Sequence, residues 1–151
     1  MKTLTENNHQ EIINAYTLKE WKPLLDLIPR IERQKSFSKR RDVFVAGNNK
    51  ITLPSFVEEP IVDEFREIVY QIPIIIDFDW SHWDEGRKMA QDEHFDFDSI
   101  DLPTKCKLIT AFVRNDRFCD GVLASAFQRG TILNILKAIE RQALKSNEVA
   151  G

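Results

Sequence analysis

The chain of 151 residues has the length of one domain, and its 42% hydrophobic and 30% charged residues are typical of a globular fold. Five glycines and six prolines exclude a collagen-like chain, and the hydrophobic content argues against disorder. The 21 basic and 24 acidic side chains give a net charge of −3, which argues against nucleic acid as the main partner.

The sequence contains no run that approaches the ~18–20 consecutive apolar residues of a membrane-spanning helix. Residues 1–15 also lack the apolar stretch of a secretory signal. We therefore expect a cytoplasmic protein with no membrane partner.

The first predicted elements are a polar arm and a helix. Residues 1–16 are mostly polar, and we expect an N-terminal arm that holds at most one helical turn. Thr17 is predicted to begin the helix, because Glu20 stands three residues later, as in a capping box. Two prolines inside the apolar pattern that follows each remove an amide hydrogen bond, which predicts a kink or an end near Ile28.

Residues 30–41 carry six basic side chains against Glu32 alone, a local balance of +5. Such a stretch fits either a phosphate or nucleic-acid contact or a solvated loop. We favour the loop, because Phe37 is the only aromatic residue available for stacking.

Two short strands are predicted next, at residues 42–46 and 51–57. The glycine and asparagines at 47–49 tolerate positive φ, so a hairpin turn is expected between them. Pro54 cannot donate a ladder hydrogen bond, which predicts an edge strand or a bulge.

Pro60 begins the clearest helical pattern, which ends before a buried strand predicted at 74–78. Either Asp79 or Ser81 is then expected to cap a short helix that runs to about Gln91.

The last third of the chain is predicted to be helical. An acidic surface loop at 92–101 leads to a helix near Pro103, which ends at a break around 115–116. A second helix is predicted at 118–128, and Thr131 caps the last one.

These elements predict a mainly helical single domain of the α+β class, with a short β-hairpin and one further strand in a small antiparallel or mixed sheet. We expect the globular domain to span 17–145, with the arm at 1–16 before it and a flexible tail at 146–151 after it.

The cysteines and histidines indicate no metal site and identify no cofactor. Cys106 and Cys119 lie in apolar helical patterns and are expected to be small buried residues, since neither has a partner at C-x-x-C spacing. His9, His82 and His94 are scattered, and no H-E-x-x-H motif occurs.

Two segments together resemble a bacterial family of unknown function. The family pattern has D-F-D-W-x-x-W, present here at 77–83, then T-x-x-V-R-x-x-R-F-x-x-G, present at 110–121, and then a terminal helix that opens with glycine, here Gly130. The likeness covers roughly residues 17–142. It implies a shared fold and candidate positions, and it transfers no reaction and no catalytic role.

Two carboxylates and two guanidiniums form the first candidate site. Asp77 and Asp79 stand two apart at the end of the predicted strand and share a face, which must meet solvent, an arginine or a ligand. Arg114 and Arg117 flank the predicted helix junction and offer planar forks suited to carboxylate or phosphate. We expect the two groups to be neighbours, as structural ion pairs or as the floor of a pocket.

Trp80 and Trp83 are three apart and are predicted to share one face of a helix or to flank its start. They fit core packing, and they equally fit stacking on a base, a sugar or a peptide side chain.

Two functions follow from this cluster. The leading one is a binding or regulatory module that recognises a protein or a small ligand, with a protein partner or a homodimer in view. The alternative is a hydrolase on a phosphorylated or nucleotide substrate, in which Asp77 and Asp79 bind a divalent metal or act as base, His82 assists proton transfer and the arginines hold phosphate. A DNA-reading helix-turn-helix is disfavoured, because residues 118–128 offer few polar side chains to base edges.

Overall fold

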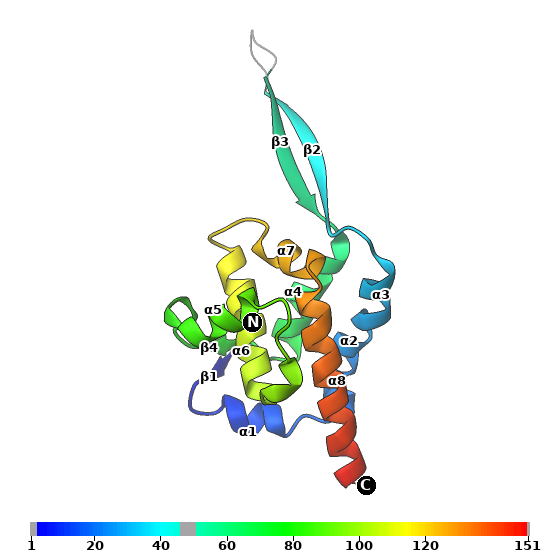
Figure 1. Ribbon diagram of the computed structural model, residues 1–151, viewed down its shortest axis with the longest axis vertical. Coiled ribbons are helices and arrows are strands. Elements are labelled where there is room, and N and C mark those ends of the chain that lie inside the picture. The colour runs from blue at the N-terminus through cyan, green and yellow to red at the C-terminus, as the bar shows by residue number, and fades with distance from the viewer. Residues whose placement is uncertain (1–2, 46–50, 151) are drawn as a thin grey trace.

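The computed structural model describes residues 3–45 and 51–150 and is mainly helical, with two small two-stranded sheets (Figure 1). Its elements in chain order are β1 (Leu4–Thr5), α1 (His9–Asn14), α2 (Leu18–Leu25), α3 (Leu27–Arg33), β2 (Ser38–Val45), β3 (Ile51–Glu58), α4 (Pro60–Gln71), β4 (Ile76–Asp77), the 3-10 helix η1 (Trp80–His82), α5 (Asp84–Gln91), the 3-10 helix η2 (Phe97–Ser99), α6 (Leu102–Asp116), α7 (Val122–Gln128) and α8 (Thr131–Ala150). The predicted α+β class is confirmed.

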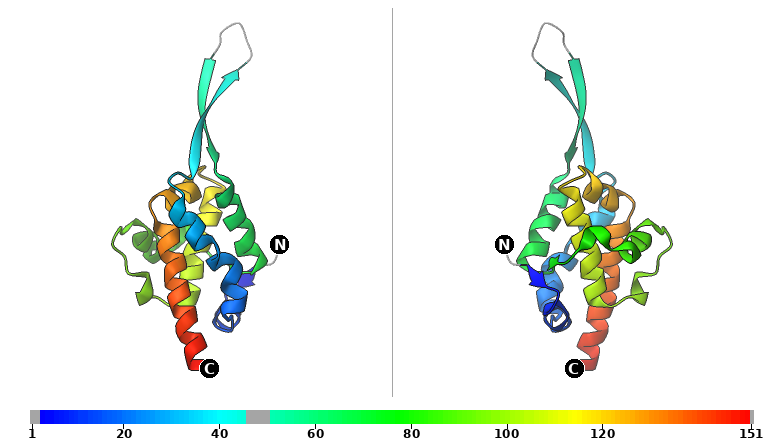
Figure 2. Two further views of the ribbon diagram at one scale, coloured as in Figure 1. Left: turned by 90° about the vertical axis from the view of Figure 1, so that its right-hand side faces the viewer. Right: turned by 90° about the vertical axis from the view of Figure 1, so that its left-hand side faces the viewer.

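The helices enclose one hydrophobic core. α6 and α8 supply its centre, where Cys106, Ile109, Ile135 and Leu136 are fully buried. α2 and α4 pack around this centre, and α5 lies on the outer side of α6 (Figures 1 and 2). Within the described residues, no helix is long and apolar enough to cross a membrane.

The predicted hairpin is confirmed as an antiparallel ribbon of β2 and β3 that projects from the helical body (Figure 2). Pro54 lies opposite Asp42, and β3 pairs with no third strand among the described residues, as expected for an edge strand. The predicted turn at 47–49 lies outside the described residues. The basic stretch 30–41 is not one loop, because its first residues belong to α3 and its last ones to β2.

The segment that leads into β2 is fixed to α7. Gln128 accepts a hydrogen bond from the Phe37 amide (3.3 Å) and donates one to the Lys35 carbonyl (3.0 Å). Phe37 is buried against Phe127, with ring centroids 5.2 Å apart. The ribbon therefore rises from an ordered base.

The N-terminal segment is folded onto the domain and does not form the predicted arm. β1 pairs in parallel with β4, and the Leu4 amide donates to the Ile75 carbonyl (2.8 Å). Leu4, His9 and Ile13 are buried. Leu4 and Ile13 are apolar residues that reach the core from between polar neighbours. A two-residue strand is too short to show an alternating pattern, so β1 could not be predicted from periodicity.

Several helix limits differ from the predictions. The chain breaks between α2 and α3 at Asp26, and both prolines lie within helices. α6 ends at Asp116, at the predicted break, but α7 begins only at Val122, after Gly121 adopts φ +89°. α8 runs to Ala150 and so includes residues 146–150 of the segment predicted as a tail. Cys106 is buried as expected, but Cys119 is exposed in the α6–α7 connection.

Candidate functional site

One carboxylate and one guanidinium of the predicted cluster meet. Arg114, in the last turn of α6, donates through Nη2 to Oδ1 of Asp77 (3.0 Å), where β4 ends. The hydroxyl of Thr3 donates to the other oxygen of Asp77 (2.7 Å). The Asp77 side chain is 58% exposed and that of Arg114 is 21% exposed, so the pair lies at the surface.

Asp79 pairs with neighbouring residues, and no contact with Arg114 or Arg117 is found among the described residues. Its carboxylate accepts hydrogen bonds from Ser81 Oγ (3.0 Å) and lies 2.9 Å from Nδ1 of His82. These hydrogen bonds, that of His82 first, lower the pKa of Asp79 below its ordinary value. Neither Asp79 nor Ser81 caps α5, as was predicted, because the N-cap position of α5 is Trp83.

The Asp79–His82–Ser81 group lacks the geometry of a catalytic triad. Ser81 Oγ lies 3.3 Å from Nδ1 of His82, the same ring nitrogen that meets Asp79. A triad needs the carboxylate on one ring nitrogen and the nucleophile on the other, so that the proton can be passed across the ring. All three residues are exposed to solvent, and such an environment does not activate a nucleophile.

Arg117 lies beside Arg114 but takes a neutral partner. Its Nη2 donates to the hydroxyl of Tyr70 on α4 (3.2 Å), and the guanidinium carbon of Arg114 lies 6.0 Å from the centre of the same Tyr70 ring. The two arginines line one open hollow of about 310 Å³. Its other lining residues are Ile76, Asp77, Phe78, Trp80 and Phe118.

Trp80 and Phe118 form an aromatic pair at the surface. Their ring centroids are 6.0 Å apart, and Phe118 is 78% exposed. Phe118 was expected on the inner face of a helix at 118–128, but it lies in the α6–α7 connection, outside any helix. Because the junction turns at Gly121, the ring faces outward beside Trp80.

Trp83 lies apart from Trp80 and packs inward. Its ring meets Phe78 edge to face, with centroids 5.5 Å apart. The backbone of Gly86 passes directly beneath the ring, so that a Cβ at this position would lie 2.1 Å from a ring carbon. Glycine is therefore required there by close approach, and the two tryptophans do not share one helix face.

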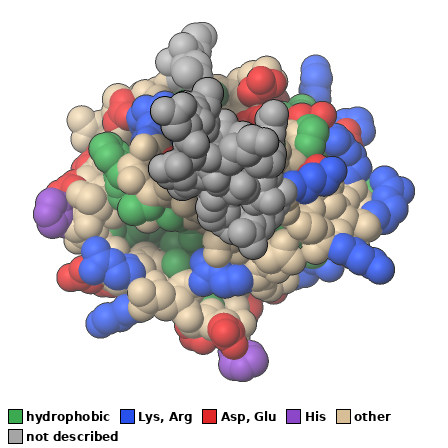
Figure 3. All heavy atoms as spheres, turned by 90° about the horizontal axis from the view of Figure 1, so that it is seen from above, with side chains coloured by type: hydrophobic (Ala, Val, Ile, Leu, Met, Phe, Trp, Pro, Cys, Tyr) green, Lys and Arg blue, Asp and Glu red, His purple; other side chains and the backbone are tan. Residues whose placement is uncertain are grey.

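A larger groove runs along α6 on the other side of Trp80, with a volume of about 530 Å³. Its walls come from η1, α5 and α6 together with both ends of α7, and they comprise Trp80, Ser81, Trp83, Gly86, Arg87, Ala90, Gln91, Leu108, Ala111, Phe112, Asn115, Val122 and Arg129. Figure 3 looks down onto the end of the body from which the ribbon rises and shows a hydrophobic hollow beside it, with Lys or Arg side chains at the edge.

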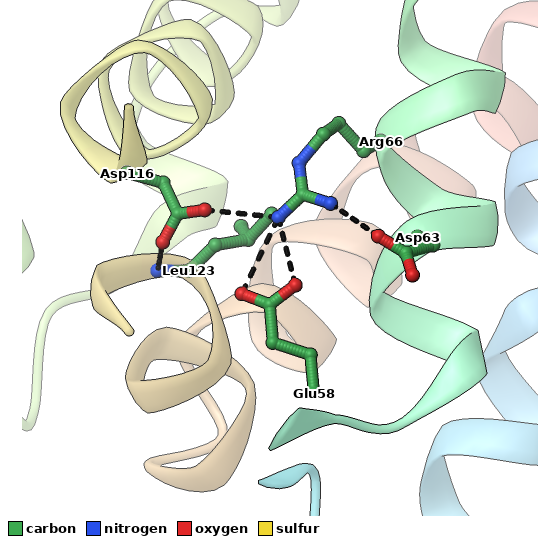
Figure 4. A network of polar contacts seen from close by, with 5 residues as sticks. All are labelled: Glu58, Asp63, Arg66, Asp116 and Leu123. Atoms are coloured by element: carbon green, nitrogen blue, oxygen red, sulfur yellow. Dashed lines mark hydrogen bonds and ion pairs between the residues drawn. The ribbon is translucent and has the colours of Figure 1, made fainter. Parts of the chain in front are cut away.

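A third group, centred on Arg66, joins the ribbon to the helices (Figure 4). Arg66 on α4 donates to Asp63 (2.5 Å), Glu58 (3.0 Å) and Asp116 (2.9 Å). Asp116 in turn accepts a hydrogen bond from the Leu123 amide in the first turn of α7 (3.0 Å). Burial by itself would lower the pKa of Arg66, but the hydrogen bonds and charges of Glu58 and Asp116 outweigh it and raise that pKa.

Sequence reasoning found Asp77, Trp80 and the two arginines near one another but missed the groove and the Arg66 network. Both are assembled from several elements that meet only in the folded chain, and no local spacing predicts such contacts. Among the described residues, no three His, Cys, Asp or Glu side chains are grouped so as to hold a metal ion.

Residues 16–145 match the model of a family of unknown function, DUF6508. No curated protein and no solved structure matches the chain.

Proposed function

We propose that this chain, which belongs to the DUF6508 family, is a binding module that holds an apolar segment of a partner protein in the groove between η1, α5, α6 and α7. The observation that carries the proposal is the aromatic pair of half-buried Trp80 and 78% exposed Phe118 at the side of the groove. Aromatic residues and arginine are the residue types that dominate binding energy at protein interfaces.

The exposure of Phe118 supports a binding role over a purely structural one. A phenylalanine that is 78% exposed contributes little to the core, and large apolar side chains in contiguous exposed groups mark interaction sites. Covering such a side chain on binding removes apolar surface from water, which is favourable by roughly 25 cal/mol per Å².

A protein segment fits this surface better than a small molecule. The groove has a volume within the range of ligand pockets, but Trp80 separates it from a second hollow, and Phe118 lines only that second hollow. A ligand that contacts all these residues must be extended and must pass over Trp80, as a peptide chain can.

The hydrolase alternative gains no support from the geometry. Asp77 is occupied by Arg114 and Thr3, and Asp79 is occupied by Ser81 and His82. The two carboxylates therefore have separate partners and are not arranged as a joint metal or acid–base site.

A random peptide library displayed on phage tests the proposed function. Peptides selected on the wild-type chain are expected to lose most of their binding to Phe118→Ala and to Ala111→Trp, which fills the groove from α6. Leu144→Ala on α8 is the matched control, because Leu144 is also a large exposed apolar residue, at 46% exposure. Peptides that bind all three variants equally, or a library that yields none, would overturn the proposal.

A further inference from the structure

We infer that the bound segment is acidic, with a carboxylate that docks on Arg117 and Arg114 while a neighbouring apolar side chain enters the groove. This inference rests on the proposed function and specifies the chemistry of its partner. It names the hollow beside Asp77 as the carboxylate-binding part of the site.

The charge of the lining residues points to an anionic partner. The two hollows together are lined by Arg87, Arg129, Arg114 and Arg117, against Asp77 as the one carboxylate among the lining residues. Arg87 lies 3.7 Å from Asp84, and Arg114 pairs with Asp77. Among the described residues, Arg117 and Arg129 therefore carry the excess positive charge of this surface, although the whole chain has a net charge of −3. Complementary charge across an interface favours an acidic segment and disfavours a basic one.

The hydrogen-bonding state of the two arginines identifies where a carboxylate would bind. A guanidinium offers five N–H donors in a planar fork that matches a carboxylate. Arg114 directs one Nη2 to Asp77, and the hydrogen bond found for Arg117 goes to the neutral hydroxyl of Tyr70. Among the side chains described, those of residues 3–39 and 57–146, no carboxylate is found within ion-pair distance of Arg117, so its charge is available to a partner.

Arg66 provides an internal contrast. Three carboxylates surround it at 2.5–3.0 Å, and the resulting network is committed to holding the ribbon and α7. The chain therefore supplies acids where an arginine has a structural role, whereas Arg117 has none of these partners. This difference favours a ligand role for Arg117.

Trp80 determines the spacing between the apolar side chain and the carboxylate of the bound segment. It lines both hollows, so the apolar anchor and the carboxylate lie on either side of one indole ring. We therefore expect the acidic and apolar residues of the partner to be close together in its sequence.

Two terminally blocked peptides test the inference, one alternating phenylalanine with glutamate and the other with glutamine in place of each glutamate. Titration into isotope-labelled protein, followed by NMR, is expected to show about tenfold tighter binding of the glutamate peptide, the size of a charge-assisted hydrogen bond. The advantage should fall below about twofold in Arg117→Gln and persist in Arg33→Gln, a matched exposed arginine on α3.

The possible outcomes distinguish a failure of this inference from a failure of the proposed function. Equal binding of both peptides, with both blocked by Ala111→Trp, would overturn the acidic partner and leave the groove as a binding site. A preference for the glutamate peptide that survives in Arg117→Gln would also overturn the assignment. If neither peptide binds, both the inference and the proposed function are contradicted.

Discussion

Arg66 and Arg117 both lie where the end of α6 meets α4, and they differ in what surrounds them. Arg66 is enclosed by Asp63, Glu58 and Asp116, and its side chain is 29% exposed. Arg117 is exposed and bonds only the phenol of Tyr70 among the contacts found in the described residues. An arginine side chain thus holds the fold together at position 66 and is exposed to solvent at position 117.

The contrast shows that a motif can mix two kinds of residue. Thr110 and Asp116 in the T-x-x-V-R-x-x-R-F-x-x-G segment serve the interior, whereas Arg117 and Phe118 in the same segment lie at the surface. The hydrogen-bond partners of a residue indicate whether it is structural, because a charged group whose hydrogen bonds are already made within the fold has few donors or acceptors free for a ligand.

The largest effect is expected at Asp116. Asp116→Ala removes the acceptor of the Leu123 amide and one of the carboxylates around Arg66, both in a partly buried setting. We expect a loss of about 2–3 kcal/mol in the free energy of unfolding, measured by urea denaturation. Asp116→Asn keeps an acceptor for the amide and should lose less. A loss under about 0.5 kcal/mol in Asp116→Ala would contradict the structural role of the network.

Thr110 should come next. Its hydroxyl is fully buried, accepts a hydrogen bond from the Ile76 amide (3.1 Å) and donates one to the Cys106 carbonyl (2.8 Å). Thr110→Val keeps the shape but leaves the Ile76 amide without a partner, so we expect a loss of about 1–2 kcal/mol. Hydrogen exchange of that amide should accelerate in the variant, and Thr110→Ser, which keeps the hydroxyl, is the control for the hydrogen bond.

Substitutions of the exposed residues Arg117 and Phe118 should destabilise the fold very little. Arg117→Gln and Phe118→Ala are each expected to change the free energy of unfolding by less than about 0.5 kcal/mol, because neither side chain is buried. Thermal unfolding followed by circular dichroism checks this. A loss of unfolding free energy comparable to that of Asp116→Ala would show that Arg117 and Phe118 are structural residues and would contradict the comparison.

The smallest effect concerns Asp79. The hydrogen bonds of His82 and Ser81 lower the pKa of Asp79 in the folded chain. The ionised Asp79 therefore stabilises the fold above the unfolded pKa of 3.8, and this stabilisation is lost as the pH falls through the folded pKa. NMR titration should find the Asp79 pKa below its ordinary value in the wild type and higher in His82→Ala. An unchanged pKa in that variant would show that the His82 contact is absent in solution.

The helices were largely predictable because their signals are local. Thr17 and Glu20 form the expected capping interaction, with the Thr17 amide donating to the Glu20 carboxylate (2.7 Å). α4 begins at the predicted proline, and α8 follows Gly130, which adopts φ +82°. Such caps and punctuating residues act within a few positions, so one sequence is enough to find them.

The candidate site was only partly predictable, since its contacts join distant segments. Asp77 and Arg114 were expected to meet and do so, but Asp79 has the closer option of Ser81 and His82. Local hydrogen bonds of this kind compete with long-range pairing and cannot be ranked against it from spacing. Phe118 was misplaced because apolar periodicity does not register the turn at Gly121.

The pairing of β1 with β4 also bears on the order in which the molecule is made. Leu4 and Thr5 pair with Ile76 and Asp77, more than seventy positions later. Synthesis proceeds from the N-terminus, so the first strand leaves the ribosome long before its partner exists. Closing so large a loop carries an entropic cost that other contacts must offset first. The beginning of the chain is thus among the last parts that can reach their final place.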